Sequence, residues 1–197
     1  TTLFRSDVYS LIGSEIRDKT VELAKAGPEL TWSAFKASMP PTLDFQLSVP
    51  VLDTKKVLAW FESSQIEGLY FNDWIKKLQQ SAVERVINET RRSLIVKDPA
   101  RVTVKRIQNA LDIGRRSAEG LTHNAIHQAQ IWADRELFLA NEDRLRSLRF
   151  TAWLDRRTTP LCRDLDGTEY PPREAPVPPL HWKCRSFLLP VLNNEKL

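Results

Sequence analysis

Residues 150–192 of this 197-residue chain read FTAWLDRRTTPLCRDLDGTEYPPREAPVPPLHWKCRSFLLPVL. The stretch holds both cysteines of the chain, one of its three histidines and seven of its twelve prolines. Its candidate metal ligands follow one another as Asp155, Cys162, His181 and Cys184, separated by six, eighteen and two residues. The last two have the spacing with which a tight turn presents two side chains to one ion, as in zinc knuckles. We therefore expect Cys162, His181 and Cys184 to converge on one point.

Three interpretations of these residues remain open on spacing alone. In the first, Cys162, His181 and Cys184 hold a structural zinc ion, and the fourth ligand is Asp155, Asp164 or a water molecule. In the second, the two cysteines form a disulfide, which would restrict the unfolded chain by about 3 kcal/mol. In the third, they are ordinary buried thiols. Because no signal peptide is recognisable and small secreted domains usually carry more cysteines, we expect a reducing compartment.

The same stretch carries a longer pattern, W-x-D-x-R-T-x-x-x-C, then L-D-G, then a proline-rich loop and H-x-x-C-R. This pattern resembles the phage Mu protein F-like family, whose members are minor head proteins, or head morphogenesis proteins, of tailed double-stranded DNA phages. The family commonly has a further cysteine, where this chain has Thr159 or Ser186. The pattern residues are Trp153, Asp155, Arg157, Thr158, Cys162, Leu165, Asp166, Gly167, His181, Cys184 and Arg185.

The resemblance implies a structural protein and no known reaction. It implies association with the portal or the inner capsid during head morphogenesis, with portal, capsid and scaffold proteins as partners. Several copies would enter one oligomeric assembly, first in the host cytoplasm and then in the phage head of the virion. A role toward packaged DNA or its ejection would fit the same location. We expect no membrane partner, because the chain has no apolar run near the length of about 20 residues that a spanning helix needs.

An enzyme is the alternative interpretation. A small HNH-like nuclease also places histidine and cysteine near a hairpin and uses a metal to cut DNA. His181 and the nearby Asp155, Asp164 and Asp166 would suit such a zinc-dependent protein that binds or cleaves DNA. However, His181 cannot easily be both a structural ligand and a general base, and the stretch has no second histidine. Because the chain also lacks a glycine-rich phosphate loop, we predict no catalytic residues.

Basic residues concentrate in one segment outside this stretch. The formal net charge of the chain is +4, yet residues 91–116 alone contain eight Lys or Arg and two Asp. A basic patch of this kind can follow DNA phosphates, because each neutralised phosphate releases a condensed counterion. A solvated helix face is an equally good interpretation. The residues we predict to contact double-stranded DNA are Arg91, Arg92, Lys105, Arg106, Arg115 and Arg116.

The periodicity predicts an α+β fold in two parts. Residues 1–147 form an elongated, mostly helical part, and residues 148–197 form a small β-rich, proline-rich knob. Apolar residues at helical spacing predict a helix over 3–26 that Gly27 and Pro28 stop, followed by a short helix around Trp32. Residues 43–51 alternate between apolar and polar, which predicts an edge strand or an extended arm near 40–52.

Further helices are predicted over 55–63, 72–96, 102–113 and 117–142, with Gly114 as a break. Four tryptophans fall in four of the predicted helical stretches, which indicates helices that bind partners through partly covered apolar stripes. His123 and His127 share one helix face, and we expect surface or interface histidines there and not a metal site. In the knob, two short strands over 150–154 and 187–192 should pair, with a turn at Asp166 and Gly167.

Overall fold

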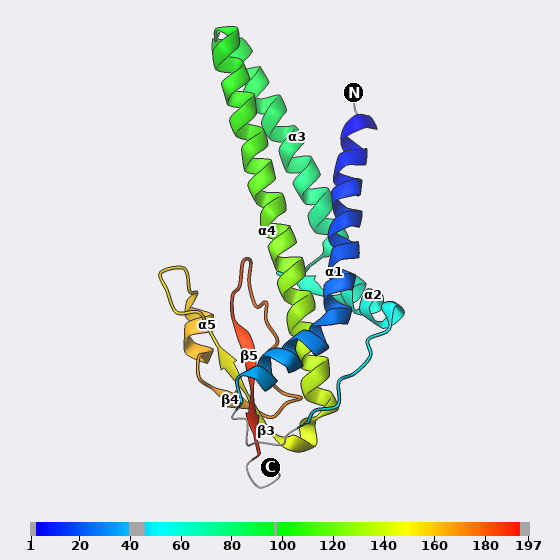
Figure 1. The fold of residues 1–197 in the computed structure, drawn as a ribbon. Helices are drawn as coiled ribbons and strands as arrows, with labels where there is room; N and C mark the ends of the chain where they lie inside the picture. The colour runs from blue at the N-terminus through cyan, green and yellow to red at the C-terminus, as the bar shows by residue number, and fades with distance from the viewer. Residues whose placement is uncertain (1–2, 40–45, 97, 194–197) are drawn as a thin grey trace.

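The computed structural model describes residues 3–39, 46–96 and 98–193 of the chain. The predicted α+β, mostly helical fold is confirmed, with four long or medium helices and two small sheets (Figure 1). The helices are α1 (Leu3–Ala37), α2 (Thr54–Ser63), α3 (Phe71–Val96), α4 (Ala100–Ala140) and the short α5 (Pro160–Leu165), with a 3-10 turn η1 (Glu142–Arg144). The strands are β1 (Gln65–Ile66), β2 (Leu69–Tyr70), β3 (Leu145–Thr151), β4 (Glu169–Tyr170) and β5 (Phe187–Leu192).

Helices α3 and α4 form an antiparallel hairpin whose connection lies far from the three-stranded sheet (Figure 1). Pro99 directly precedes α4, which suits a residue with no backbone N–H to donate. The break predicted at Gly114 is wrong, because α4 runs through this position as one helix of 41 residues. A single glycine costs a helix only about 1 kcal/mol, which the packing of a long helix easily outweighs. None of the described helices is long and apolar enough to span a membrane.

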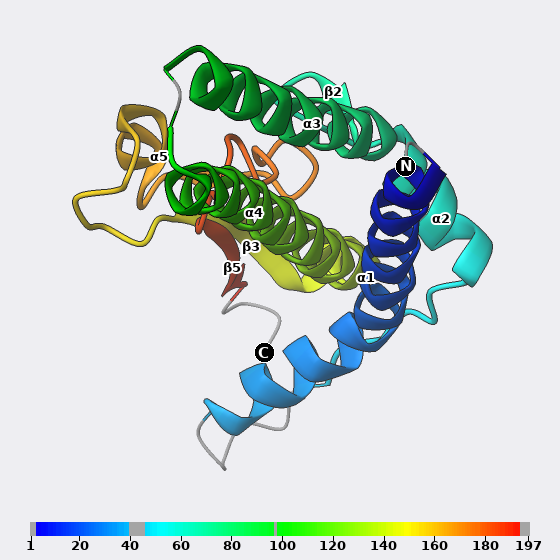
Figure 2. The same cartoon turned by 90° about the horizontal axis from the view of Figure 1, so that it is seen from above.

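Helix α1 also corrects a prediction, because it continues through Gly27 and Pro28 to Ala37 and includes Trp32. At Gly27 the helix crosses α4 so closely that an added Cβ would lie 2.5 Å from the Cβ of Ala133. Glycine is therefore present here for close helix packing and not as a stop signal. Proline inside a helix removes one hydrogen bond and bends the axis. Figure 2 shows that the last part of α1 leaves at an angle to the first.

The segment after α1 is extended but forms no strand over its described residues 46–53, so the predicted strand is wrong there. Residues 40–45 of the predicted arm lie outside the described residues. Leu47 and Leu52 are buried in the chain's own core. The side chain of Asn141 binds both backbone groups of Ser48, donating to its carbonyl (2.8 Å) and accepting from its N–H (2.7 Å). This segment is thus held by the chain itself at its described end.

The three-stranded sheet is antiparallel and has the order β4-β3-β5. The predicted pairing of two strands across the proline-rich loop is confirmed, with Phe150 opposite Leu188, but the bounds predicted for the first strand, 150–154, are wrong, because β3 spans Leu145–Thr151. The turn expected near Gly167 is present, and Gly167 adopts a positive φ of 78°, a conformation that glycine accepts without strain. The short elements α5 and β4 were not predicted, because neither is long enough to show a period.

One core joins the sheet to the end of α4. Leu137 and Phe138 of α4 pack in the same buried cluster as Leu148, Phe150 and Cys162. The boundary predicted between residues 147 and 148 falls inside β3. The four helical tryptophans lie in four different helical stretches as predicted, except that Trp32 belongs to α1, and Trp60 stacks on Trp132 at 4.8 Å. The knob therefore shares its core with the helical part.

Candidate metal centre and its surroundings

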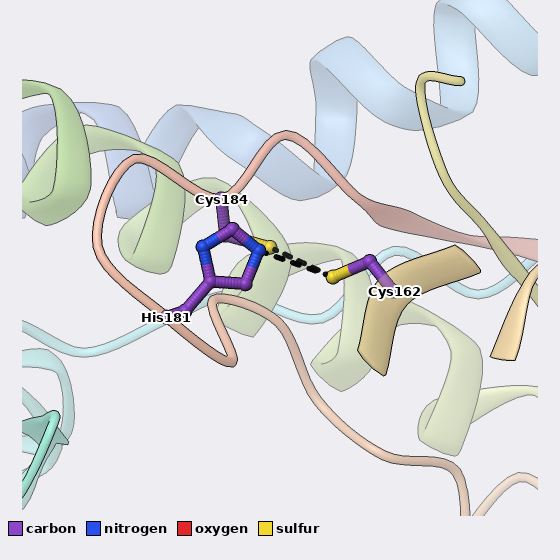
Figure 3. A group of neighbouring side chains, drawn as sticks. All are labelled: Cys162, His181 and Cys184. Atoms are coloured by element: carbon purple, nitrogen blue, oxygen red, sulfur yellow. Dashed lines mark hydrogen bonds between the residues drawn. The ribbon is translucent and has the colours of Figure 1, made fainter. Parts of the chain in front are cut away.

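Cys162, His181 and Cys184 converge as predicted. The sulfur of Cys162 lies 3.9 Å from the sulfur of Cys184 and 3.2 Å from Nε2 of His181. Figure 3 shows Cys162 facing the other two residues from α5, while His181 and Cys184 come from one turn. The three ligand atoms all lie within 4.8 Å of one another. Two thiolates on one tetrahedral zinc, with bonds near 2.3 Å, are about 3.8 Å apart, so the sulfur separation fits a shared ion.

The cysteines are free thiols and the disulfide interpretation is not borne out. Sulfurs joined by a bond lie about 2 Å apart, well below the distance found here. Both residues are buried, with exposed fractions of 1% for Cys162 and 0% for Cys184. Burial raises the pKa of the Cys162 thiol, while hydrogen bonds from Ser186 and Thr159 act in the opposite direction. A bound cation would stabilise the thiolates that burial disfavours.

The hydrogen bonds of His181 prepare it as a ligand. Its Nδ1 lies 3.0 Å from the carbonyl oxygen of Trp182, and a carbonyl can only accept, so Nδ1 carries the proton. The lone pair is then on Nε2, which faces the two sulfurs. Histidines that bind metals commonly donate their other N–H to such an acceptor. The set therefore has the donors, tautomer and spacing of a site that can hold a metal ion such as zinc.

Local sequence places each member of the set. Thr159 caps α5 by accepting from the N–H of Cys162, and Pro160 begins the helix. The second pair sits on a tight turn in which the N–H of Cys184 donates to the carbonyl of His181 (3.1 Å). Lys183 within that turn has a φ of +56°, an uncommon value for a residue other than glycine. The turn thus presents both ligands from one side.

Asp155 does not belong to the set, which corrects its assignment as a ligand. Both of its carboxylate oxygens accept from the guanidinium of Arg185, at 2.6 and 2.8 Å. The hydrogen bonds from Arg185 and from the N–H of Arg157 hold the pKa of Asp155 far below its ordinary value. Among the described residues, no carboxylate joins the two sulfurs and the imidazole. The carboxylate of Asp155 is instead used in a bidentate pair, a strong charge-assisted interaction.

The turn that carries His181 and Cys184 also packs on the helices, a contact that the sequence did not predict. Trp182 packs on Trp74 of α3, with ring centroids 4.6 Å apart. Its edge lies so close to α4 that a Cβ at Gly120 would be 2.8 Å from the indole. The N–H of Lys183 donates to Oδ1 of the fully buried Asn124 (2.8 Å). The sequence could have indicated this contact, because Trp182 lies between two candidate ligands in a turn. A tryptophan in a turn usually has a packing partner.

The basic segment lies at the far end of the α3–α4 hairpin, which we call the hairpin end (residues 87–96 and 100–108). Among the six residues predicted to contact DNA, Arg106 pairs with Asp98 (3.0 Å) and lies 3.8 Å from Glu89. Arg115 pairs with Glu119, and Arg116 donates to the carbonyl of Asp112. No ion pair of Arg91, Arg92 or Lys105 is found among the described residues, and these three are exposed.

His123 and His127 border a separate, mostly apolar cavity of about 600 Å³ between α1, α4 and β5. Their rings are 6.1 Å apart, and they form no metal-ligand group among the described residues. His123 is exposed, whereas His127 is half-buried. Desolvation, helped by the charge of His123, lowers the pKa of His127 to about 4. Asp134 on the same wall accepts from Thr31 and Gln130, and its burial raises its pKa.

Fold and site together define a class of architecture. A Cys-His-Cys set from α5 and from the turn before β5 lies at the core of a small antiparallel sheet, and that turn packs on a helical hairpin. Comparison with protein-family models, with curated proteins and with solved structures found no match to this chain. The resemblance to the Mu protein F-like family accordingly rests on the pattern residues of the knob.

Proposed function

We propose that the chain is a structural minor head protein of a tailed double-stranded DNA phage. In this proposal it binds the portal or the inner capsid during head morphogenesis, in the host cytoplasm, and remains in the head of the virion. Its partners are portal, capsid and scaffold proteins, in several copies, and the hairpin end reaches DNA that is packaged or ejected. A structural zinc ion bound by Cys162, His181 and Cys184 holds the knob together.

One observation carries this proposal: the polar pattern residues of the knob bind one another and the backbone around them. Asp155 binds Arg185 through two hydrogen bonds. Asp166 accepts from the N–H of Ala152 (2.7 Å), which fixes the start of the loop after β3. Thr158 donates to the carbonyl of Trp153 (2.6 Å) and accepts from the N–H of Asp155 (2.8 Å). Side chains used in this way support a rigid structural unit.

The same contacts weigh against a nuclease. A general base needs a free lone pair near the reacting water. His181 turns Nε2 toward the thiols and donates from Nδ1, so neither ring nitrogen is available once a metal is bound. Asp155, one of the carboxylates considered for a catalytic metal, is ion-paired with Arg185. A zinc protein that cleaves DNA therefore needs residues beyond this site.

Co-expression with the portal protein of the same phage tests the proposal. We expect the chain to co-purify with portal rings in a fixed ratio and to contain about one zinc ion per copy. The matched variant is Cys184→Ser, which should lose zinc and portal binding together, while Ser63→Ala, an exposed residue on α2, should change neither. If the chain binds neither portal nor capsid proteins but cuts DNA when a divalent metal is added, the nuclease interpretation would be correct.

A further inference from the structure

The proposed metal would have three protein ligands and one open coordination position. Structural zinc sites are almost always closed by four protein ligands, whereas a site with three ligands accepts a further molecule. Within the described part of the chain, only Cys162, His181 and Cys184 form a group able to hold a metal. Of the two carboxylates considered as a fourth ligand, Asp155 is bound by Arg185, and Asp164 does not belong to the group. The fourth ligand must then come from water or from another molecule.

A narrow hollow leads to this position. A cavity of about 10 Å³, enough for one water-sized group, is bordered by Cys162, His181, Ser186 and neighbouring residues. It shares Arg157, His181, Lys183 and Arg185 with an outer pocket of about 440 Å³ that opens beside α4. The two hollows are therefore neighbours beside the ligand set, and we refer to them together as the route.

The walls of that route are cationic. Three of the four residues that border both hollows are Arg157, Lys183 and Arg185. Zinc with two thiolates and one imidazole has no net charge, so the metal does not cancel the positive wall. Asp155 neutralises Arg185, but Arg157 lies 3.7 Å from that carboxylate with 78% of its side chain exposed, and Lys183 is exposed. The acid in the outer pocket, Glu119, pairs with Arg115.

We propose that this route admits a carboxylate group, which binds the metal through one oxygen and Arg157 and Lys183 through the other. Carboxylate oxygens are ordinary zinc ligands, and guanidinium groups match their geometry. A planar carboxylate fits a hollow one group wide better than a tetrahedral phosphate does. The proposal rests on the metal-centred knob of the proposed function and adds a ligand class to it: an acidic side chain or chain terminus of a partner, or a free carboxylic acid.

Cobalt provides the test, because the visible absorption of Co²⁺ responds to a change in its fourth ligand. The full chain is loaded with Co²⁺, and thiol titration establishes that both cysteines are bound. Acetate is then added at constant ionic strength, with phosphate and a blocked glutamate peptide as parallel arms. We expect a saturable spectral change with acetate at lower concentration than with phosphate. A tighter response to the peptide assigns the carboxylate to a protein partner, and equal responses assign it to a free acid.

Variants distinguish direct contacts of Arg157 and Lys183 with the carboxylate from the general effect of positive charge. Arg157→Gln and Lys183→Gln should each raise the apparent dissociation constant for acetate about three- to tenfold. Arg156→Gln is the matched control, because Arg156 is the exposed neighbour of Arg157 and borders neither hollow. The carboxylate site would be refuted if acetate did not change the spectrum of bound Co²⁺, or if all three variants had the same dissociation constant for acetate. Neither result would affect the proposed metal site of the knob. Failure of the two thiols to bind any metal would overturn both.

Discussion

The knob and the hairpin end use their side chains in opposite ways. In the knob, the polar pattern residues bind one another, and Leu148 and Phe150 are fully buried. At the hairpin end, Ile95 and Val96 of α3 are 81% and 60% exposed, and Val104 of α4 is 54% exposed. The same segments carry the exposed Arg91 and Lys105. The side chains of the knob are thus used in contacts within the chain, including those with α3 and α4, whereas the hairpin end leaves apolar and basic side chains exposed.

Removal of one metal ligand should give the largest effect and separate the two regions. Because binding of a structural metal is folding free energy, Cys184→Ser should lower the free energy of unfolding by about 3–5 kcal/mol. Hydrogen exchange should show lost protection in β3 and β5 and retained protection along α3 and α4. A chelator should bring the wild type to the level of the variant and leave the variant unchanged. Equal protection of β3 in both proteins would show that the knob needs no metal.

The stability of the fold should respond to pH through His127, which borders the cavity between α1, α4 and β5. Its folded pKa of about 4 lies below the ordinary 6.5, so the fold prefers the neutral ring. As pH falls from about 6.5 to 4, the imidazole binds a proton in the unfolded chain but not in the folded chain. The free energy of unfolding therefore falls by up to about 3 kcal/mol. His127→Gln should flatten the curve of unfolding free energy against pH in that window.

Two comparisons isolate the effect of His127. The raised pKa of Asp134 has the opposite sign, because its neutral form is favoured by the fold and stability falls as pH rises through its titration. Asp134 is present in both wild type and His127→Gln, so their difference reports the histidine. His123→Gln, at the exposed member of the pair, should change the curve less. Parallel curves for wild type and His127→Gln would refute the assigned burial.

Charge at the hairpin end should matter for binding and not for folding. Arg91→Glu combined with Lys105→Glu should weaken binding to random-sequence DNA about 10- to 100-fold and flatten its salt dependence, since each lost phosphate contact removes about 0.9 from the slope. Lys36→Glu with Lys55→Glu, two exposed lysines outside the hairpin end, is the control. Arg106 is left intact, because its ion pair with Asp98 supports the hairpin. DNA affinity that is absent or independent of salt would leave this segment a solvated face.

The sequence predicted those features that depend on residues close to one another along the chain. Two residues between His181 and Cys184 are enough to define a turn, so the convergence of the Cys-His-Cys set was predicted. Alternation predicted that a strand near residue 150 pairs with residues 187–192, but it missed that β3 begins at Leu145. Gly27 was misinterpreted because its role depends on Ala133, far along the chain. Asp155 was misassigned for a similar reason, since its partner Arg185 competes with a metal for the same oxygens. Trp182 was missed because its partner Trp74 lies on another helix.

Exposed apolar residues at the hairpin end should have the smallest effect on stability and still decide association. Ile95→Gln with Val104→Gln should change the free energy of unfolding by no more than about 0.5 kcal/mol, because neither side chain is buried. If a partner or another copy covers these residues, the same variant should reduce self-association and dye binding, since exposed apolar patches mark interaction sites. Val51→Gln is the control, with an exposed fraction of 97% outside the hairpin. Sedimentation measures self-association, and co-purification measures portal binding. If the wild type is a monomer at all concentrations and the variant binds the portal unchanged, the hairpin end is not an interface. The knob would then be the part that contacts other proteins.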